Sequence, residues 1–408
     1  MIDDRLLARA QPQPHLGEDG KSKHGSTARF RSDVEGFRAV AVSLVLLYHA
    51  HFLGLRGGYV GVDVFFVLSG FLITRLLVDA ASSSKTTRQV LVQFYARRIR
   101  RLLPLSSVVL LVTLWCSYHW LGFLRGNSIA RDSRWSSAFL ANIHFARIGT
   151  DYLGSQSLPS PIQHFWSLAV EEQFYFIWPA LVLLLVRLTR RESRQQTLRY
   201  AFGGIAAVSF IWCLYQTRTN GTWAYFSPAA RTWELAVGAL VAVESSRFVR
   251  LPHRALVFVG WLGLAITIVS AFVFGKGTPF PGSAAAVPVL GTAMVLASGG
   301  TGNPVVSILS IKPLQWVGKI SYSLYLWHWP LLIIAEGHQG SALSALSRIL
   351  LLVGAVLISI VSYLVVENPV RNSRYLAARP VLTFGLGFVM IETTVAYASH
   401  LLAVYSGH

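Results

Sequence analysis

The stretch HFWSLAVEEQFYFIWP, residues 164–179, places two adjacent carboxylates, Glu171 and Glu172, in a segment that is otherwise mostly aromatic and aliphatic. The apolar run continues to Leu185 without another charge. About 20 apolar residues are enough to cross a bilayer as a helix. The segment therefore predicts a membrane-spanning helix, and it raises the question of why two acids lie within it.

The composition of the whole chain agrees with this prediction. Of its 408 residues, 53% are hydrophobic and 13% are charged, and the mean hydropathy is +0.50. Soluble domains carry about 25% charged residues. Only helices and closed barrels satisfy their backbone in lipid, and these apolar runs are too long and uniform for barrel strands. We therefore predict an all-α, polytopic membrane helix bundle.

Eleven segments are predicted as spans, which gives a bundle of about 10–11 transmembrane helices. They are residues 37–54, 58–79, 102–124, 163–186, 200–217, 232–244, 255–274, 284–299, 314–336, 346–366 and 380–404. The chain then divides into a disordered cytoplasmic tail over 1–36, a membrane domain over 37–375 and an additional C-terminal transmembrane helix within 376–408.

The charge pattern predicts the orientation of the spans. The formal net charge is +18, which in a soluble protein would indicate nucleic-acid binding. In a membrane protein it reflects Lys and Arg gathered in cytoplasmic loops, as in the basic segment 80–101. We therefore expect a protein of the cytoplasmic (inner) membrane with no nucleic-acid partner. Its N-terminus is predicted to be cytoplasmic and its C-terminus extracytoplasmic.

Ionisable residues inside spans are expensive and mark functional pathways or structural ion pairs. Arg38 and His49 are the first such pair. They are eleven residues apart, close to three helical turns, so they share one face and lie roughly 16 Å apart along the axis. The alternative reading is a snorkelling arginine with an interfacial histidine.

A second cluster is the segment FYARRIRRLLP, residues 94–104. It contains two overlapping Arg-x-x-Arg pairs, whose members are Arg97 with Arg100 and Arg98 with Arg101. Residues three apart share a helix face, and two guanidinium groups on one face suit a phosphate or pyrophosphate. The alternatives are an ordinary cytoplasmic anchor and a lipid-headgroup site.

The acids form a third group. Glu171 and Glu172 point about 100° apart on a helix, so they cannot share one partner equally. One is expected to face a cavity and the other an arginine, a tyrosine or a helix end, or both belong to structural networks. Asp63 is either functional or a helix-start residue. The glycines before it, within GGYVG at 57–61, permit close helix contact.

Taken together, these residues identify a family by resemblance. The chain resembles the acyltransferase-3 family of integral-membrane O-acyltransferases, which includes O-antigen acetylases, over about residues 33–375. The matching motifs occur in the family's order: the Arg-x10-His of Arg38 and His49, GGYVGVDVFFVLSGFLI, FYARRIRRLLP, HFWSLAVEEQFYFIWP and ISYSLYLWHWPLL. The family opening Asp-Gly-Leu-Arg is replaced here by Glu-Gly-Phe-Arg at 35–38, which keeps the arginine.

The resemblance implies an acyl-CoA-dependent O-acyltransferase. The acyl group, acetyl or another short chain, passes from cytosolic acyl-CoA to a hydroxyl of a sugar-containing envelope glycan, a glycolipid or an exported metabolite. It also implies essential roles for Arg38 and His49 and a role in CoA handling for Arg97, Arg98, Arg100 and Arg101. Many relatives continue into an extracytoplasmic SGNH domain. This sequence stops at His408, which leaves room for a separate extracytoplasmic acyltransferase as a partner.

A mechanism follows as a hypothesis. Arginines at the cytoplasmic end hold the CoA phosphates, and the thioester reaches His49, which acts as a general base or forms an acyl-histidine. Glu171 or Glu172 would orient His49. Acetyl-CoA is the expected co-substrate. No metal is expected, because Cys116 and Cys213 lack metal-ligand spacing. The competing hypothesis is a proton-coupled transporter of a glycan or lipid.

Overall fold

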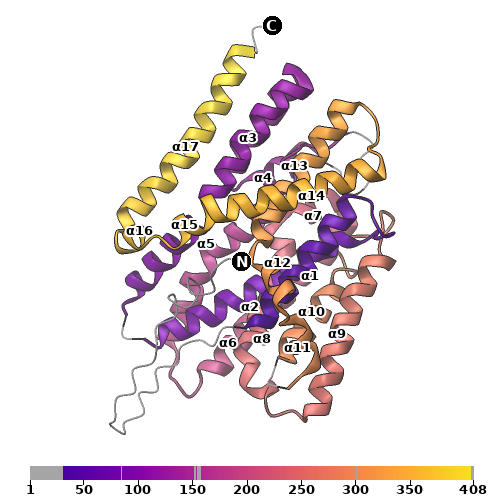
Figure 1. The fold of residues 1–408 in the computed structure, drawn as a ribbon. Helices are drawn as coiled ribbons and strands as arrows, with labels where there is room; N and C mark the ends of the chain where they lie inside the picture. Colours follow the sequence, from indigo (N-terminus) through magenta and orange to yellow (C-terminus); the bar gives the residue numbers. More distant parts are fainter. Residues whose placement is uncertain (1–30, 84, 151–152, 154–157, 300–301, 406–408) are drawn as a thin grey trace, which may run out of the picture. The chain divides into compact units, whose positions relative to one another are not determined.

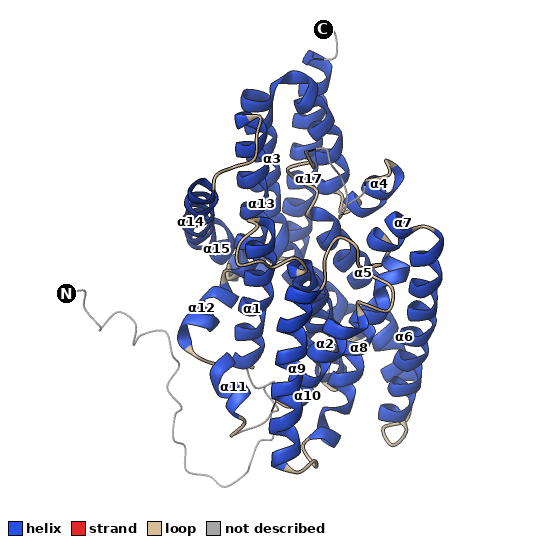
Figure 2. Cartoon of the chain, turned by 90° about the vertical axis from the view of Figure 1, so that its right-hand side faces the viewer, coloured by secondary structure: helices blue, strands red, loops and turns tan. Residues whose placement is uncertain are grey.

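The computed structural model describes residues 31–83, 85–150, 153, 158–299 and 302–405. Within these ranges every regular element is a helix and no strand occurs (Figures 1 and 2). This confirms the predicted all-α class. The predicted disordered tail lies, as far as Phe30, outside the described residues.

Seven helical segments of the described chain are long and apolar enough to cross a membrane. They are Gly58–Ala81 (η2, Gly58–Val60, and α2, Gly61–Ala81), Thr87–Ser137 (α3), Phe165–Leu188 (α5), Arg194–Thr219 (α6), His253–Val273 (α9), Ala345–Ala378 (α14, Ala345–Ser362, η3, Tyr363–Glu367, α15, Asn368–Arg371, and α16, Arg374–Ala378) and Pro380–Tyr405 (α17). Each of the seven overlaps one of the eleven predicted spans.

The other four predicted spans are also helical, but they are shorter or more polar. They correspond to α1 (Ser32–His49), α8 (Pro228–Phe248), α10 (Ala286–Ala297) and the pair α12 (Lys312–Lys319) with α13 (Ser321–Gln339). More than half of α1 and most of α13 are buried. The polar side chains of these helices therefore contact protein instead of lipid. The remaining short helices are α4 (Ala141–Arg147), α7 (Gly221–Phe226) and α11 (Pro304–Leu309).

The helix contacts define where a site can form. α2 packs against α1, α5 and α8, while α13 packs against α1, α3 and α14. α17 runs along α3, and the axis of α14 is steeply inclined to both (Figures 1 and 2). The sequence motifs on α1, α2, α3, α5 and α13 are thereby brought into one part of the bundle.

The first helix begins earlier than the composition predicted. α1 starts at Ser32, so residues 32–36 belong to a helix and not to the disordered tail. Asp33 and Glu35 lie in its first turn, where negative charge is favoured by the helix dipole. Arg31 also binds Asp33 at 2.5 Å. The tail boundary at residue 36 is therefore wrong by about one helical turn.

Two glycines let α1 and the start of α2 touch, as the sequence predicted. A Cβ atom at Gly58 would lie 2.3 Å from the carbonyl oxygen of Leu44, and one at Gly61 would lie 2.3 Å from that of Ala41. Both contacts are with backbone of α1, which cannot move aside as a flexible side chain can. This close approach fixes α1 against α2.

We expect Gly61→Ala to destabilise the protein by about 1–3 kcal/mol, because the added methyl group forces α1 and α2 apart. Thermal unfolding of the detergent-solubilised protein, followed by size-exclusion chromatography, measures the effect. Gly385→Ala on α17 is the matched control, since a Cβ there meets no atom within 4 Å. Equal melting temperatures for the two variants would contradict the close contact.

Candidate active site

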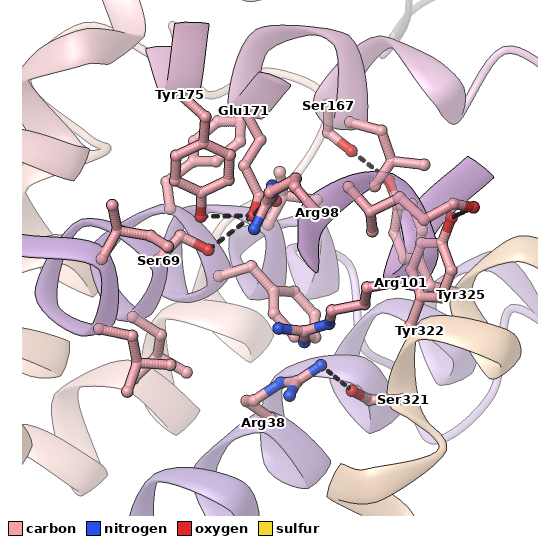
Figure 3. A pocket seen from close by; sticks show the side chains of 18 residues that line it. Arg38, Ser69, Arg98, Arg101, Ser167, Glu171, Tyr175, Ser321, Tyr322 and Tyr325 are labelled. Atoms are coloured by element: carbon pink, nitrogen blue, oxygen red, sulfur yellow. Dashed lines mark hydrogen bonds and ion pairs between the residues drawn. The ribbon is translucent and has the colours of Figure 1, made fainter. Parts of the chain in front are cut away.

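A pocket lies among α1, α2, α3, α5 and α13, and three guanidinium groups line it (Figure 3). We call it the arginine pocket. One wall is apolar and is formed mainly by α2, including Phe65, Leu72 and Ile73. The polar side chains that line it are Arg38, Ser69, Arg98, Arg101, Ser167, Glu171, Tyr175, Ser321, Tyr322 and Tyr325.

Arg98 is neutralised inside this pocket. Its Nη2 atom lies 3.0 Å from Glu171 Oε1 and 2.5 Å from Glu172 Oε1, and its Nε donates to Glu172 at 2.8 Å. The guanidinium carbon lies 3.5 Å from the centre of the Tyr175 ring. Tyr175 and Ser69 each donate a hydroxyl hydrogen bond to Glu171, at 2.7 and 2.9 Å. The two acids of the opening motif thus form a polar network with Arg98.

We predicted that one acid faces a cavity and the other an arginine, a tyrosine or a helix end, and this prediction is correct only in part. Glu171 lines the pocket whereas Glu172 does not, and Glu172 makes the larger share of the contact with Arg98. However, both acids bind Arg98, and the structure brings neither of them to His49. The reason is that the side of α5 with Glu171 and Glu172 faces Arg98 of α3, while His49 is the last residue of α1.

Arg38 and Arg101 are less closely paired than Arg98, because Glu367 acts on both of them only from beyond ion-pair distance. Arg38 donates to Ser321 Oγ at 2.9 Å, and the buried Nε of Arg101 has no hydrogen-bond partner among the described residues. Neither makes an ion pair in that part of the chain. Both guanidinium groups point toward the same space in Figure 3. Two such groups beside an apolar wall suit a bound phosphate.

The structure distinguishes the two overlapping Arg-x-x-Arg pairs. Arg98 and Arg101 face the arginine pocket, whereas Arg97 is exposed and Arg100, although only 6% exposed, does not line it. The expectation that residues three apart share a face is confirmed for Arg98 and Arg101.

A second pocket lies at the other end of α1 and α13, and His49 lines it. We call it the histidine pocket. Its wall is more polar than that of the arginine pocket and includes Gln163, Lys276, Glu336 and Arg348, with Tyr48 and Trp329 beside His49. His51, in the loop after α1, also lines it. Partial burial, reinforced by the positive charge of Arg348, lowers the pKa of His51.

His49 meets a second histidine. Its Nδ1 lies 3.0 Å from Nε2 of His328, which is fully buried on α13, and the Trp329 ring packs 4.4 Å from it between centroids. His328 lies in the motif ISYSLYLWHWPLL, but no role was predicted for it from the sequence. A signal was present, because Ser321, Tyr325 and His328 follow one another at spacings of four and three and so share one face of a helix.

A layer of contacts lies between the residues that line the two pockets. Ser167 and Tyr325 line the arginine pocket and hydrogen-bond to each other at 2.6 Å. The Tyr325 hydroxyl also contacts the carbonyl oxygen of His164 at 3.1 Å, and the His164 ring lies 5.9 Å from the His328 ring. Arg38 and His49, predicted to serve one continuous path, therefore line different pockets.

Asp63 is a structural ion-pair partner. Its Oδ1 atom binds Arg231 of α8 at 2.8 Å, and Glu234 binds the same nitrogen at 2.7 Å. The three side chains are at most 1% exposed and line neither pocket. Asp63 also lies in the first turn of α2, as expected for a residue at the start of a helix.

Comparison with known proteins now identifies the class. Residues 31–364 match the acyltransferase-domain family, and the chain therefore belongs to that family. With seven apolar helices in the described part of the chain, it is an integral membrane protein. This agrees with the resemblance drawn from the motifs on α1, α2, α3, α5 and α13.

The similar relatives are named as O-acetyltransferases, and two of the three names specify peptidoglycan. The chain is 31% identical to the peptidoglycan O-acetyltransferase OatA of Listeria monocytogenes over 85% of its own length and 57% of the relative's. It is 29% identical to the putative peptidoglycan O-acetyltransferase YrhL of Bacillus subtilis (85% and 56%), and 28% identical to the O-acetyltransferase OatA of Staphylococcus aureus (86% and 58%). The chain thus spans somewhat more than half the length of these relatives. No solved structure matches it.

The network around Arg98 makes a prediction about stability. Arg98→Gln leaves Glu171 and Glu172 without their cation, which typically costs about 3–5 kcal/mol for a buried pair. Arg101→Gln removes a cation without an ion-pair partner in the described chain, so it should leave stability near that of the wild type. Thermal unfolding in detergent compares the two variants. The same loss in both, or none in Arg98→Gln, would refute the assignment of Arg98 to a structural network.

Proposed function

We propose that this protein transfers an acyl group, acetyl in the simplest case, from cytosolic acyl-CoA to a sugar hydroxyl of a cell-envelope glycan. The observation that carries the proposal is a pair of guanidinium groups, Arg38 and Arg101, that make no direct ion pair in the described chain and line a pocket of a protein in an acyltransferase family. The names of the relatives favour peptidoglycan as the acceptor.

The arginine pocket is the proposed donor site. Arg38 and Arg101 would bind phosphate groups of CoA, and the apolar wall from α2 would contact the pantetheine arm and the acyl group. Arg98 has a different task, because its charge is already balanced by Glu171 and Glu172. It shapes the wall and holds α3 against α5. The positive-inside rule supports an orientation in which this end of the bundle faces the cytoplasm, where acyl-CoA is made.

The histidine pocket is the proposed acceptor site. Aromatic rings such as Trp329 and Tyr48 offer flat apolar surfaces for sugar rings, and the polar groups around them can bind hydroxyl and carboxylate groups. His49 lines this pocket, so a sugar hydroxyl bound there reaches an imidazole. The proposed orientation puts this pocket on the extracytoplasmic side, where envelope glycans are exposed.

Acyl-CoA and the sugar hydroxyl together account for every bond and proton in the reaction proposed at His49. The imidazole takes the proton of the sugar hydroxyl as the oxygen bonds to the acyl carbon and the thioester C–S bond breaks, and the proton then passes to the CoA sulfur. In the competing route, an imidazole nitrogen attacks the thioester carbon, the C–S bond breaks and CoA leaves as the thiol; the sugar oxygen then takes the acyl group from the histidine, and the hydroxyl proton returns to the imidazole. Either route requires the acyl group to pass the layer of Tyr325 and Ser167. That layer therefore separates donor from acceptor until the acyl group is transferred.

The donor site is tested by acetyl-CoA kinetics with protein in lipid nanodiscs and a muropeptide acceptor. Arg101→Gln should raise KM for acetyl-CoA roughly 10-fold or more, because a hydrogen bond to a charged group contributes about 1.5–3 kcal/mol. Arg97→Gln removes the same charge from the same helix outside the pocket and should change KM less than about 2-fold. Equal effects of the two variants would refute the donor site.

The reaction itself is tested in a strain that lacks this gene. Mass spectrometry of its envelope glycans should show the loss of an acetyl mass that wild-type protein restores and His49→Ala, at matched protein level, does not. Restoration by His49→Ala would remove His49 from the reaction. An unmodified glycan or lipid that merely changes sides of the membrane would instead support a transporter. An acetyl group found only on another envelope protein would indicate a separate extracytoplasmic acyltransferase.

A further inference from the structure

We propose that His328 is a positioning residue, which fixes His49 in the tautomer with hydrogen on Nδ1 and a lone pair on Nε2. The inference rests on the proposed function, in which His49 is the reacting imidazole. In this arrangement a neutral histidine orients His49 in the way that a carboxylate orients the histidine of a hydrolase triad.

The tautomer follows from a chain of hydrogen bonds with a fixed end. Nδ1 of His328 lies 3.0 Å from the carbonyl oxygen of Leu324, one turn earlier on α13. A carbonyl oxygen only accepts, so this nitrogen carries the hydrogen. Burial at 0% exposure disfavours a charged ring, and a neutral His328 therefore has its lone pair on Nε2.

The same logic extends to His49. Nε2 of His328 lies 3.0 Å from Nδ1 of His49, and one of these two atoms must donate. Since the His328 nitrogen carries a lone pair, Nδ1–H of His49 is the donor. A neutral His49 then has its own lone pair on Nε2, which is the atom that takes the hydroxyl proton or attacks the thioester.

The ring geometry suits a hydrogen bond more than stacking. The two ring planes are only 15° apart, and their centroids are 5.2 Å apart. This separation exceeds the nitrogen–nitrogen distance by about the diameter of one imidazole ring, so the two nitrogens lie near the line between the ring centres. The N–H of one ring and the lone pair of the other are therefore nearly aligned. Trp329, against the His49 ring, is itself held by its Nε1–H donated to Ser160 at 2.9 Å.

The surroundings explain why an imidazole takes this place. The carboxylates of the opening motif, Glu171 and Glu172, are bound to Arg98. A carboxylate behind His49 would bring a full charge into the bundle interior, and burying it would need compensation. A neutral imidazole supplies an acceptor without that charge. It keeps its own orientation through a backbone carbonyl of a regular helix, which is a rigid anchor.

Two variants of similar polarity separate this role from packing. The side-chain oxygen of His328→Gln can reach the place of Nε2 and accept from His49, whereas His328→Asn can reach only the place of Nδ1. We expect His328→Asn to lower kcat for acetyl transfer about 100-fold or more, with KM for acetyl-CoA changed less than about 2-fold. We expect His328→Gln to stay within about 10-fold of wild-type kcat. Wild-type kcat in His328→Asn, or equal losses in both variants, would overturn the proposal.

A measurement without turnover distinguishes failure of this inference from failure of the proposed function. In protein labelled with ¹⁵N-histidine, the signals of His49 are assigned by their loss in His49→Gln. Wild type should show a protonated Nδ1 and a lone-pair Nε2, and His328→Asn should shift His49 toward the other tautomer. A wild-type His49 protonated on Nε2 would overturn the proposal. If the wild type transfers no acetyl group, the proposed function fails, and these spectra alone decide the role of His328.

Discussion

The constraint on which this structure depends is the cost of a polar or charged side chain in hydrocarbon. Seven apolar helices meet that constraint by length and composition, whereas α1, α8 and α13 do not. α1 carries Arg38 and His49, and α13 carries His328. α8 carries Arg231 and Glu234, which surround Asp63. These three helices are tolerated because much of their surface is covered by other helices. Polar residues also lie on three of the seven apolar helices, Asp63 on α2, Arg98 on α3 and Glu171 on α5, and there each of them is held in an ion pair.

A charge buried inside the protein still needs a partner of opposite charge. The arginines differ in whether carboxylates of this chain contact them directly. Arg98 and Arg231 each contact two carboxylates, which makes them part of the scaffold. Arg38 has a hydroxyl partner, and Arg101 has none within the described chain for its buried Nε. An uncompensated charge costs stability, and a protein keeps it where a ligand supplies the opposite charge. Charge balance, more than position in a motif, thus separates the arginines proposed to bind the donor from the arginines held in ion pairs.

The sequence predicted the helices and the residues that matter better than it predicted their partners. Hydropathy located eleven helical segments, and periodicity placed Arg98 with Arg101 on one face. Neither reveals which helix that face meets, so the binding of Glu171 and Glu172 to Arg98 was not foreseen. His328 was missed for the same reason: a histidine among tryptophans and tyrosines resembles packing until α13 is placed beside α1. The boundary at residue 36 failed because local composition ignores the first-turn acids of α1.

The pairing of α1 with α13 gives the two pockets a common frame. Arg38 contacts Ser321 at one end, and His49 contacts His328 at the other. The two helices therefore hold the proposed donor and acceptor sites at a fixed separation, while Tyr325, on the same face of α13, lies in the layer between them. A shift of α13 against α1 would disturb the arginine pocket, the layer and the orientation of His49 together. In the proposed reaction, transfer across the layer is thus coupled to the orientation of His49, because α13 carries Ser321, Tyr325 and His328, which contact the arginine pocket, the layer and His49.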